Sequence, residues 1–407
     1  MPSLQLLNKL ERLRAFNGTL AIRKPYGLTS FDCLRYLNLA LTHAHNNLTR
    51  RHGFVMHDYP PLPMNFVYPG RNSDHINSTL QRFPPPNPKR VTLLNSMVDA
   101  ERLDPHNLAD LYLYTLMSGY PSSLIMQSKK KYRLKLGHGG TLDPLASGVL
   151  LVNLGDATKL SQAYQESYKT YVATGVLGIA TDSLDMDGEI VKRADPSHIT
   201  EASLKATLDK FLGFTMQKPP LHSAIQVNGV RLYDYARTGK VYPSQLAERA
   251  VRIKRITLNF LRQELDPTTV SPVLAAVARM QKYRANPEGY EEDPDIEAAL
   301  EDNPMTPPIL CGITRRVETV ATQLTGLPVF QIEVEAGGGT YIRSLVDDIG
   351  RELGCAATLI DLVRTKQYDY SLTDETPTLM QCRDPFVIER HLVPYAERIS
   401  ETVTPKF

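Results

Sequence analysis

The segment that most constrains the fold of this 407-residue chain is Gly137–Gly148, which reads GHGGTLDPLASG. Its glycines allow tight bends and a close approach of the backbone to a ligand. Pro144 restricts the backbone directly after Asp143. The apolar run Val149–Val152 follows and predicts a buried strand. We therefore expect one carboxylate, Asp143, on a glycine-rich loop in front of a strand of the core.

Two interpretations of Asp143 follow from these residues alone. Catalytic side chains often lie on loops that a rigid scaffold positions, so Asp143 is a candidate catalytic acid. Glycine, aspartate and proline are also ordinary turn residues, and an Asp-Pro turn between strands needs no function. Taken locally, the segment favours the ordinary turn.

Composition excludes several classes of protein. The net charge is only +2, so a nucleic-acid partner must be inferred from local patches. No apolar run approaches the roughly 20 residues that span a membrane, and we expect no membrane partner. The cysteines form no CxxC pair, which favours reduced thiols in an intracellular protein over a disulfide framework or a zinc ribbon. These cysteines are Cys33, Cys311, Cys355 and Cys382.

The N-terminal segment, residues 1–20, has no signal-peptide core. It is rich in leucine and carries more basic than acidic residues, a pattern shared by mitochondrial presequences and ordinary amphipathic helices. We expect the nucleus, the mitochondrion or both as the compartment, with the cytoplasm as the alternative.

Two stretches differ from the rest of the chain and indicate insertions. Residues 45–128 carry proline clusters and polar runs, a mixture typical of an inserted segment rather than of a core. Residues 266–324 form the second stretch. They include Glu288–Asp302, which holds eight acidic residues and no Lys or Arg and is typical of a solvated loop.

The remaining segments predict a mixed α+β domain. Tyr171–Gly178 and Val329–Glu335 have the pattern of strands. Glu201–Phe211 and Ile342–Leu353 have helical spacing of apolar residues. Strands and helices follow one another without regular βαβ repetition, which is typical of a mixed α+β domain.

Arg343 lies in the first turn of the helix predicted from Ile342, where a cation opposes the helix dipole. A carboxylate partner would explain this position. Asp143 is a plausible partner, and a neighbouring arginine would keep that acid ionised.

Four motifs occur together in one order: KPYGLTS at Lys24–Ser30, GHGGTLDPLASGVL from Gly137, KxY at Lys169–Tyr171 and GTYIRSLVDDIG from Gly339. In this order the chain resembles the TruB-type tRNA pseudouridine synthases, most closely their eukaryotic stand-alone members. The similarity covers about residues 20–44, 130–262 and 326–370. With it, the interpretation of Asp143 reverses in favour of catalysis.

The resemblance implies the pseudouridine synthase fold, an α+β domain whose mixed, largely antiparallel sheet is flanked by helices. It also implies a domain organisation in which the two insertions interrupt the catalytic domain. The 45 residues after Leu362 are too few for the C-terminal PUA domain that many members carry. The expected parts are an N-terminal extension (1–19), a catalytic domain (20–370) and a C-terminal extension (371–407).

The resemblance also assigns site residues. Asp143 matches the nucleophilic aspartate, and Arg343 matches the arginine that pairs with it. Tyr171 matches the tyrosine that packs against the target uracil and is a candidate for proton removal. Leu362 matches the apolar residue that closes the uracil pocket, and His138 matches the histidine that supports the bound RNA loop.

The chemistry agrees with this set. Isomerising uridine breaks the N1–C1′ bond, turns the base and rejoins it through C5, with no redox step and no group donor. We therefore expect no cofactor and no metal, and the sequence has neither GxxxxGK nor HExxH. A carboxylate nucleophile divides a difficult step in two. Attack at C1′ and attack on the uracil ring both remain open, and in either case the base must leave its stack for an aromatic and apolar pocket.

Two basic clusters are candidates for phosphate contacts. The first precedes the glycine-rich loop and is favoured as an RNA contact by that position. It contains Lys129, Lys130, Lys131 and Arg133, together with Lys135. The second contains Arg252, Lys254 and Arg255, and here solvated surface charge is an equal alternative.

The leading hypothesis is a monomeric, guide-independent enzyme that makes pseudouridine 55 in the TΨC arm of tRNA. One alternative is a guide-dependent rRNA pseudouridine synthase, and another is an RNA-binding chaperone that folds tRNA without catalysis. The chain departs from the family pattern in the long gap after KPYGLTS, in the glycines at Gly337–Gly339 and in Gln226, where a lysine is frequent.

Overall fold

The computed structural model describes residues 16–49, 134–220, 247–262, 271–285 and 314–400, with short pieces at 223, 225–227 and 230–232. Most of both predicted insertions lies outside these ranges. So does the first basic cluster, Lys129–Arg133.

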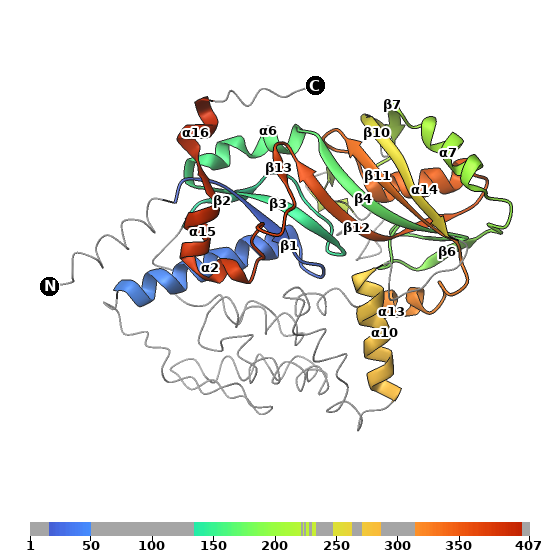
Figure 1. The fold of residues 1–407 in the computed structure, drawn as a ribbon, viewed down its shortest axis with the longest axis horizontal. Coiled ribbons are helices and arrows are strands. Elements are labelled where there is room, and N and C mark those ends of the chain that lie inside the picture. The colour runs from blue at the N-terminus through green and yellow to red at the C-terminus, as the bar shows by residue number, and fades with distance from the viewer. Residues whose placement is uncertain are drawn as a thin grey trace.

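One ten-stranded sheet organises the chain (Figure 1), with the order β14-β1-β3-β12-β4-β11-β10-β7, while β13 pairs with β12 and β2 with β3. All of these pairs are antiparallel except β3 with β12. The strands are β1 (Gly18–Lys24), β2 (Leu136–His138), β3 (Ala146–Leu154), β4 (Lys169–Leu177), β7 (Gly213–Gln217), β10 (Arg249–Arg262), β11 (Val329–Ala336), β12 (Ala357–Gln367), β13 (Tyr370–Ser371) and β14 (Leu392–Pro394). Two small hairpins add β5 (Ile179–Thr181) with β6 (Ile190–Arg193) and β8 (Gln226–Val227) with β9 (Val230–Arg231).

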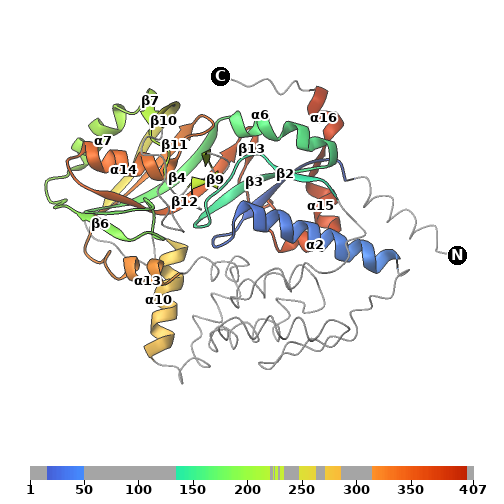
Figure 2. The same ribbon diagram turned by 180° about the vertical axis from the view of Figure 1, so that it is seen from behind.

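Helices lie against this sheet on both sides (Figures 1 and 2). The α-helices are α2 (Ser30–Thr49), α6 (Ser161–Glu166), α7 (Glu201–Asp209), α10 (Pro272–Ala285), α13 (Arg315–Ala321), α14 (Ile342–Glu352), α15 (Pro385–His391) and α16 (Tyr395–Ser400). Two 3-10 helices are η3 (Gly155–Leu160) and η4 (Gln381–Arg383). The predicted α+β class with a largely antiparallel sheet is confirmed, as are the two predicted strands and the two predicted helices.

The core explains why the active-site loop is rigid. Every residue of β3 is buried, as its uninterrupted apolar run predicts for a strand covered on both faces. Alternate residues of β3 belong to different clusters: Leu150 and Val152 pack with α2, whereas Val149 and Leu151 pack with Tyr164 of α6. The loop before β3 is therefore anchored at its C-terminal end by a strand that is buried throughout.

Strand register places α2 and α14 on the same face. Ala146 pairs with Leu362, Leu362 with Ala173, and Ala173 with Ile332, so these side chains share one face across four strands. On this face Leu150 packs with α2, and Ile332 packs with α14. The two helices cover different halves of the face, and the loop before β3 lies between them.

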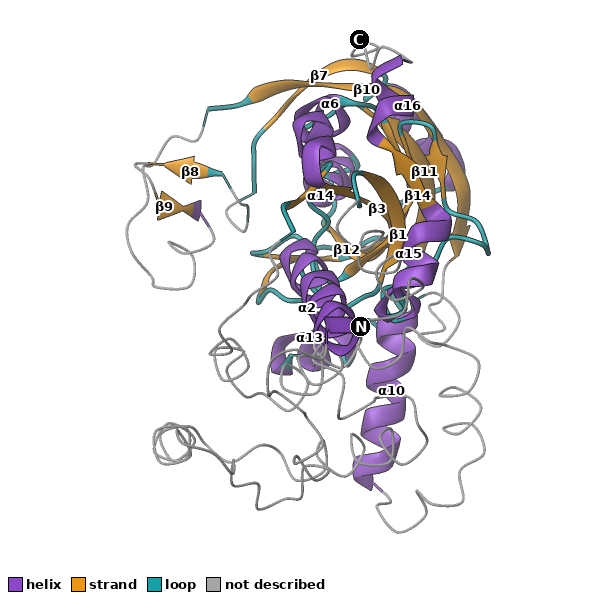
Figure 3. Cartoon of the chain, turned by 90° about the vertical axis from the view of Figure 1, so that its left-hand side faces the viewer, coloured by secondary structure: helices purple, strands orange, loops and turns teal. Residues whose placement is uncertain are grey.

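Segments assigned to the insertions and the C-terminal extension also build the core. Val273 and Val277 of α10 and Val317 of α13 are buried in the cluster that contains α2. Near the C-terminus, β14 pairs with β1, so two segments far apart in sequence lie side by side at the sheet edge (Figure 3).

Candidate active site

Asp143 lies on the loop between β2 and β3, and buried side chains fix this loop on its first half. Gln367 Nε2 donates to the Gly139 carbonyl, and Arg364 Nη2 donates to the Gly140 carbonyl at 3.2 Å. The Gly139 amide donates to the Leu151 carbonyl at 2.9 Å. Both glycines are thus bound to the strands beneath them.

The second half of the loop is fixed from the opposite side, by residues of the KPYGLTS motif. The Leu142 amide donates to Ser30 Oγ at 2.9 Å. Lys24, which has no exposed surface, donates from Nζ to the carbonyls of Pro144 at 3.4 Å and Ala146 at 2.6 Å. Burial lowers the pKa of Lys24 to about 8, with the Asp143 carboxylate among the groups that oppose this shift. The backbone on both sides of Asp143 is therefore held by hydrogen bonds.

Gly148 permits the close parallel pairing behind the loop. Its φ of +104° is unfavourable for residues with a side chain, and a Cβ atom there would lie 2.2 Å from the Arg364 carbonyl oxygen. The conformation of the GHGG…SG segment therefore depends on this glycine, which brings β12 against β3.

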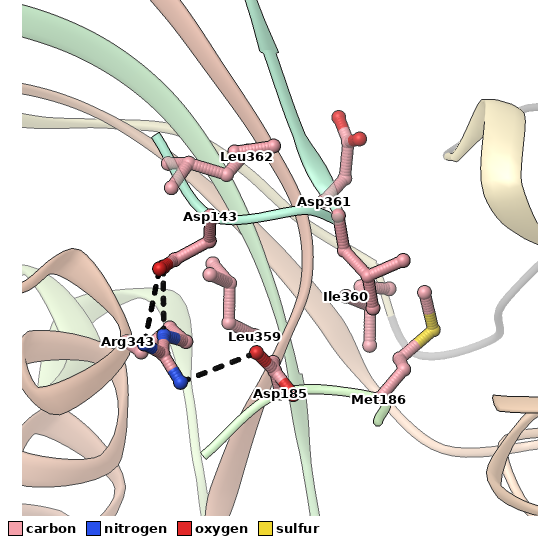
Figure 4. Close-up of a pocket in the computed structure, with 10 residues that line it drawn as sticks. Asp143, Asp185, Met186, Arg343, Leu359, Ile360, Asp361 and Leu362 are labelled. Atoms are coloured by element: carbon pink, nitrogen blue, oxygen red, sulfur yellow. Dashed lines mark hydrogen bonds and ion pairs between the residues drawn. The ribbon is translucent and has the colours of Figure 1, made fainter. Parts of the chain in front are cut away.

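Asp143 and Arg343 form a two-pronged ion pair (Figure 4). Arg343 Nε lies 2.7 Å from Asp143 Oδ2, and Nη2 donates to Oδ1 at 3.1 Å. The Arg343 side chain is 4% exposed, whereas that of Asp143 is 30% exposed. The arginine is thus fixed in the protein interior while the carboxylate remains open to a ligand.

A second carboxylate completes this arrangement. Arg343 Nη1 lies 3.4 Å from Asp185 Oδ2 and donates to the Ser183 carbonyl at 2.9 Å. Burial raises the pKa of Asp185, while the Arg343 charge opposes the shift. Burial alone lowers the pKa of Arg343, but Asp143 and Asp185 outweigh it and raise the pKa above its usual value.

A pocket opens beside this ion pair. Its walls combine three aspartates, Asp143, Asp185 and Asp361, with apolar side chains (Figure 4). Leu362 is one of the apolar residues. The lining residues are Asp143, Leu145, Ala146, Asp185, Met186, Arg343, Leu359, Ile360, Asp361 and Leu362. The structure therefore brings together three residues of the predicted site, Asp143, Arg343 and Leu362.

Tyr171 and His138 lie nearby but do not line the pocket. Tyr171 pairs across strands with Arg364, and burial raises the pKa of its phenol while Arg364 lowers it. His138 Nδ1 accepts a hydrogen bond from the Gly140 amide at 3.3 Å. Burial and the charge of Arg364 lower the pKa of His138, which favours the neutral imidazole.

Asp361 is a buried carboxyl group on the strand that carries Leu362. Tyr26 donates to Asp361 Oδ1 at 2.9 Å. Burial raises the pKa of Asp361 to about 7, and the hydrogen bond from Tyr26 only partly opposes the shift. This contact ties the KPYGLTS turn to β12, 335 residues away.

Sequence reasoning missed five polar side chains of this region: Lys24, Asp185, Asp361, Arg364 and Gln367. Lys24 was visible as the first residue of a motif, and Arg364 and Asp361 stand beside Leu362 in sequence. For Asp361 and Arg364 the signal is a charged residue inside an otherwise apolar strand, because a charged side chain buried there needs a partner.

The side chains of the second basic cluster already have partners on the protein surface. Lys254 lies 2.7 Å from Glu335, and Arg255 lies 2.6 Å from Glu333. Arg252 stacks over the exposed ring of Phe214. Two of its three cations therefore have carboxylate partners, which favours the surface-charge interpretation for them.

Within the described ranges, no helix is long and apolar enough to cross a membrane. The same residues contain no group of three His, Cys, Asp or Glu side chains placed to hold a metal ion.

Comparison with known proteins places this site in context. The family model described as TruB family pseudouridylate synthase (N terminal domain) matches residues 126–271, which contain Asp143 and Tyr171. The chain is 34% identical over 290 residues to tRNA pseudouridine synthase 4 of Schizosaccharomyces pombe, covering 63% of this chain and 71% of the relative. It is 35% identical over 241 residues to tRNA pseudouridine synthase B of Lactobacillus delbrueckii subsp. bulgaricus, covering 59% of this chain and 61% of that relative.

One similar solved structure is titled "Crystal Structure of a Cbf5-Nop10-Gar1 Complex". It has 23% identity and a TM-score of 0.33, and the match covers 63% of this chain and 47% of that chain. The chain thus spans less than two thirds of the bacterial relative and about half of this structure.

Proposed function

Because the chain belongs to the TruB family of pseudouridylate synthases, we propose that it isomerises uridine to pseudouridine at position 55 in the TΨC loop of tRNA. We propose further that it acts without a guide RNA and as a monomer. The observation that carries the proposal is the ion pair of Asp143 with Arg343 at the edge of an apolar pocket.

Asp143 is suited to act as the nucleophile. Its carboxylate accepts two contacts from one guanidinium, an arrangement that fixes the direction of the free lone pairs. A covalent intermediate with the ribose or the base then divides the reaction into two easier steps. Arg343 also stabilises the carboxylate when it leaves.

The pocket suits a neutral, planar base. Leu359, Leu362 and Met186 supply apolar walls, and a uracil that has left its stack needs such surfaces. Because the loop around Asp143 is held by several buried groups, the carboxylate does not need to be reoriented when the base enters. The conformational entropy of the loop is therefore lost during folding rather than when the base binds.

The reaction exchanges one proton for another. After the base turns and C5 joins C1′, the proton on C5 must leave, and N1 gains a proton. Tyr171 is the candidate acceptor of the C5 proton, since its phenol is buried near Asp143 and beside Arg364.

The test uses purified full-length protein, unmodified tRNA and the isolated TΨC stem-loop, with no other RNA. We expect pseudouridine at position 55 in both substrates. Asp143→Asn should reduce the single-turnover rate by about 10³-fold or more while leaving tRNA affinity unchanged, because it removes the nucleophile and keeps the shape. Asp187→Asn, an exposed acid that hydrogen-bonds Thr314, is the matched control.

Each competing function gives a different result. A guide-dependent enzyme would modify neither substrate until a guide RNA is added. A tRNA-folding chaperone would bind both substrates, form no pseudouridine and be unaffected by Asp143→Asn. Either result would overturn the proposal.

A further inference from the structure

Arg364 is a buried cation to which the proposed function assigns no part in the reaction. It is fully buried in the middle of the sheet, at the strand position that pairs with Tyr171 of β4 and Gly148 of β3. Its Nε donates to the Val149 carbonyl at 2.7 Å, and Nη2 donates to the Gly140 carbonyl at 3.2 Å. Both acceptors are neutral.

Arg343 and Arg364 therefore differ in how their charges are balanced. Arg343 contacts two carboxylates, those of Asp143 and Asp185. Arg364 forms no ion pair with any residue in the described part of the chain. Removing a guanidinium from water without a counter-charge costs free energy, and that cost falls when negative charge appears beside it.

Two nearby groups can carry such negative charge. The Asp143 carboxylate and the Tyr171 phenol both interact with the Arg364 charge. Of the two, Asp143 is already paired with Arg343, whereas Tyr171 lies directly across the strand pair from Arg364. The third guanidinium nitrogen of Arg364, Nη1, is buried and has no hydrogen-bond partner among the described residues, so it is available to the Tyr171 oxygen. A negative charge on the Tyr171 oxygen would therefore be the change that Arg364 stabilises most directly.

We propose that Arg364 is a positioning residue that holds the Tyr171 hydroxyl and stabilises the phenolate which removes the proton from C5. The proposal rests on the proposed function. In this step the phenolate oxygen takes the C5 proton and becomes a phenol. The electrons of the C5–H bond pass into the ring and restore the C5–C6 double bond, and N1 takes a proton from water. Because burial raises the pKa of Tyr171, its side chain rests as a neutral phenol, and the phenol proton passes to solvent before this step. The proton taken from C5 then restores the phenol.

Arg364 also holds Gly140, so its two roles must be separated experimentally. Gln367 provides the matched control, because it is a buried residue of the same strand that holds the neighbouring Gly139 carbonyl. It carries no charge and pairs across strands with Lys169 rather than Tyr171. Substituting Gln367 weakens the loop and leaves the surroundings of Tyr171 unchanged.

The experiment compares single-turnover rates on tRNA carrying hydrogen or deuterium at C5 of the target uridine. We expect Arg364→Gln to slow the reaction by about 100-fold, the usual cost of removing a group that stabilises developing negative charge. We also expect its deuterium isotope effect to exceed that of the wild type, because proton removal from C5 becomes the slow step. Gln367→Met should slow the reaction with no rise in the isotope effect, and Arg364→Lys should fall between the wild type and Arg364→Gln.

A second measurement replaces Tyr171 with 3,5-difluorotyrosine, whose phenolate forms more readily. In the Arg364→Gln variant, this replacement should raise the single-turnover rate at least tenfold. In the Gln367→Met variant, it should not raise the rate. If Arg364→Gln fails to fold, Arg364→Lys with difluorotyrosine provides the same comparison.

Equal isotope effects in the Arg364 and Gln367 variants, or no recovery by difluorotyrosine, would overturn the proposal and leave Arg364 as a residue that only holds the loop. Failure of the proposed function is distinguishable, since the wild-type protein would then form no pseudouridine on either substrate.

Discussion

Ion pairs of similar length occur in two regions of this protein, at the pocket (the inner pair) and on the exposed surface of β10 (the outer pair). Arg343 approaches Asp143 at 2.7 Å, and Lys254 approaches Glu335 at 2.7 Å. The Arg343 side chain is 4% exposed, whereas the Lys254 side chain is 57% exposed. Water screens the exposed Lys254 ammonium more strongly than the buried Arg343 guanidinium, so the same distance implies different energies. The comparison teaches that burial, rather than distance, separates the two regions.

The largest expected effect comes from changing the buried arginine. Arg343→Lys keeps the charge but replaces a planar fork with a point charge, which cannot contact both Asp143 oxygens, Asp185 and the Ser183 carbonyl together. We expect kcat to fall by about 100-fold, corresponding to about 2.7 kcal/mol, with little change in the Kd for tRNA. Single-turnover kinetics and a binding assay measure both quantities.

A matched control lies two helical turns further along α14. Arg351 is 67% exposed and pairs with Asp347, so Arg351→Lys should leave kcat within about twofold of the wild type. Wild-type turnover in Arg343→Lys, or equal losses in both variants, would remove the distinction between buried and exposed pairs.

The next effect concerns stability and pH. Because the pKa of Asp361 is raised to about 7, from about 3.9 in an unfolded chain, the folded state binds one proton more than the unfolded state between these values. The contribution of Asp361 to the free energy of unfolding therefore falls as pH rises from about 4 to 7. Asp361→Asn removes this titration. The free energy of unfolding of the variant should therefore rise by roughly 2–4 kcal/mol relative to that of the wild type between about pH 4 and 7. Urea unfolding at a series of pH values measures the difference.

Tyr26→Phe removes the hydrogen bond that opposes this shift. The hydrogen bond from Tyr26 lowers the pKa of Asp361, so its removal should extend the loss of stability to higher pH. Parallel curves of unfolding free energy against pH for the wild type and Asp361→Asn would contradict the prediction, because Asp361 would then titrate alike in both states.

The two regions also differ in how much of them could be predicted from sequence. The alternating apolar residues of Val329–Glu335 and the helical spacing from Ile342 were sufficient to place β11 and α14. The contact between Asp143 and Arg343 was predictable from one physical argument, because an arginine in the first turn of a helix opposes the dipole unless an anion lies beside it.

The supporting groups could not be predicted in the same way. Lys24, Arg364 and Asp361 are charged, and residue type alone predicts that charged side chains are exposed. Their burial depends on contacts between segments far apart in sequence, such as the hydrogen bond from Tyr26 in the KPYGLTS turn to Asp361 in β12. Periodicity within one segment contains no information about such contacts.

The smallest expected effect concerns the outer pair, Lys254 with Glu335. A double-mutant cycle with Lys254→Ala and Glu335→Ala should give a coupling energy of about 0.5 kcal/mol or less, and 0.5 M salt should reduce it further. Chemical unfolding of the four proteins measures this value, and catalysis should be unchanged in all of them. A coupling above about 1 kcal/mol, insensitive to salt, would mean that the outer pair behaves as a buried one. Exposure would then not be what separates the two regions, and the geometry of each pair would have to explain its energy instead.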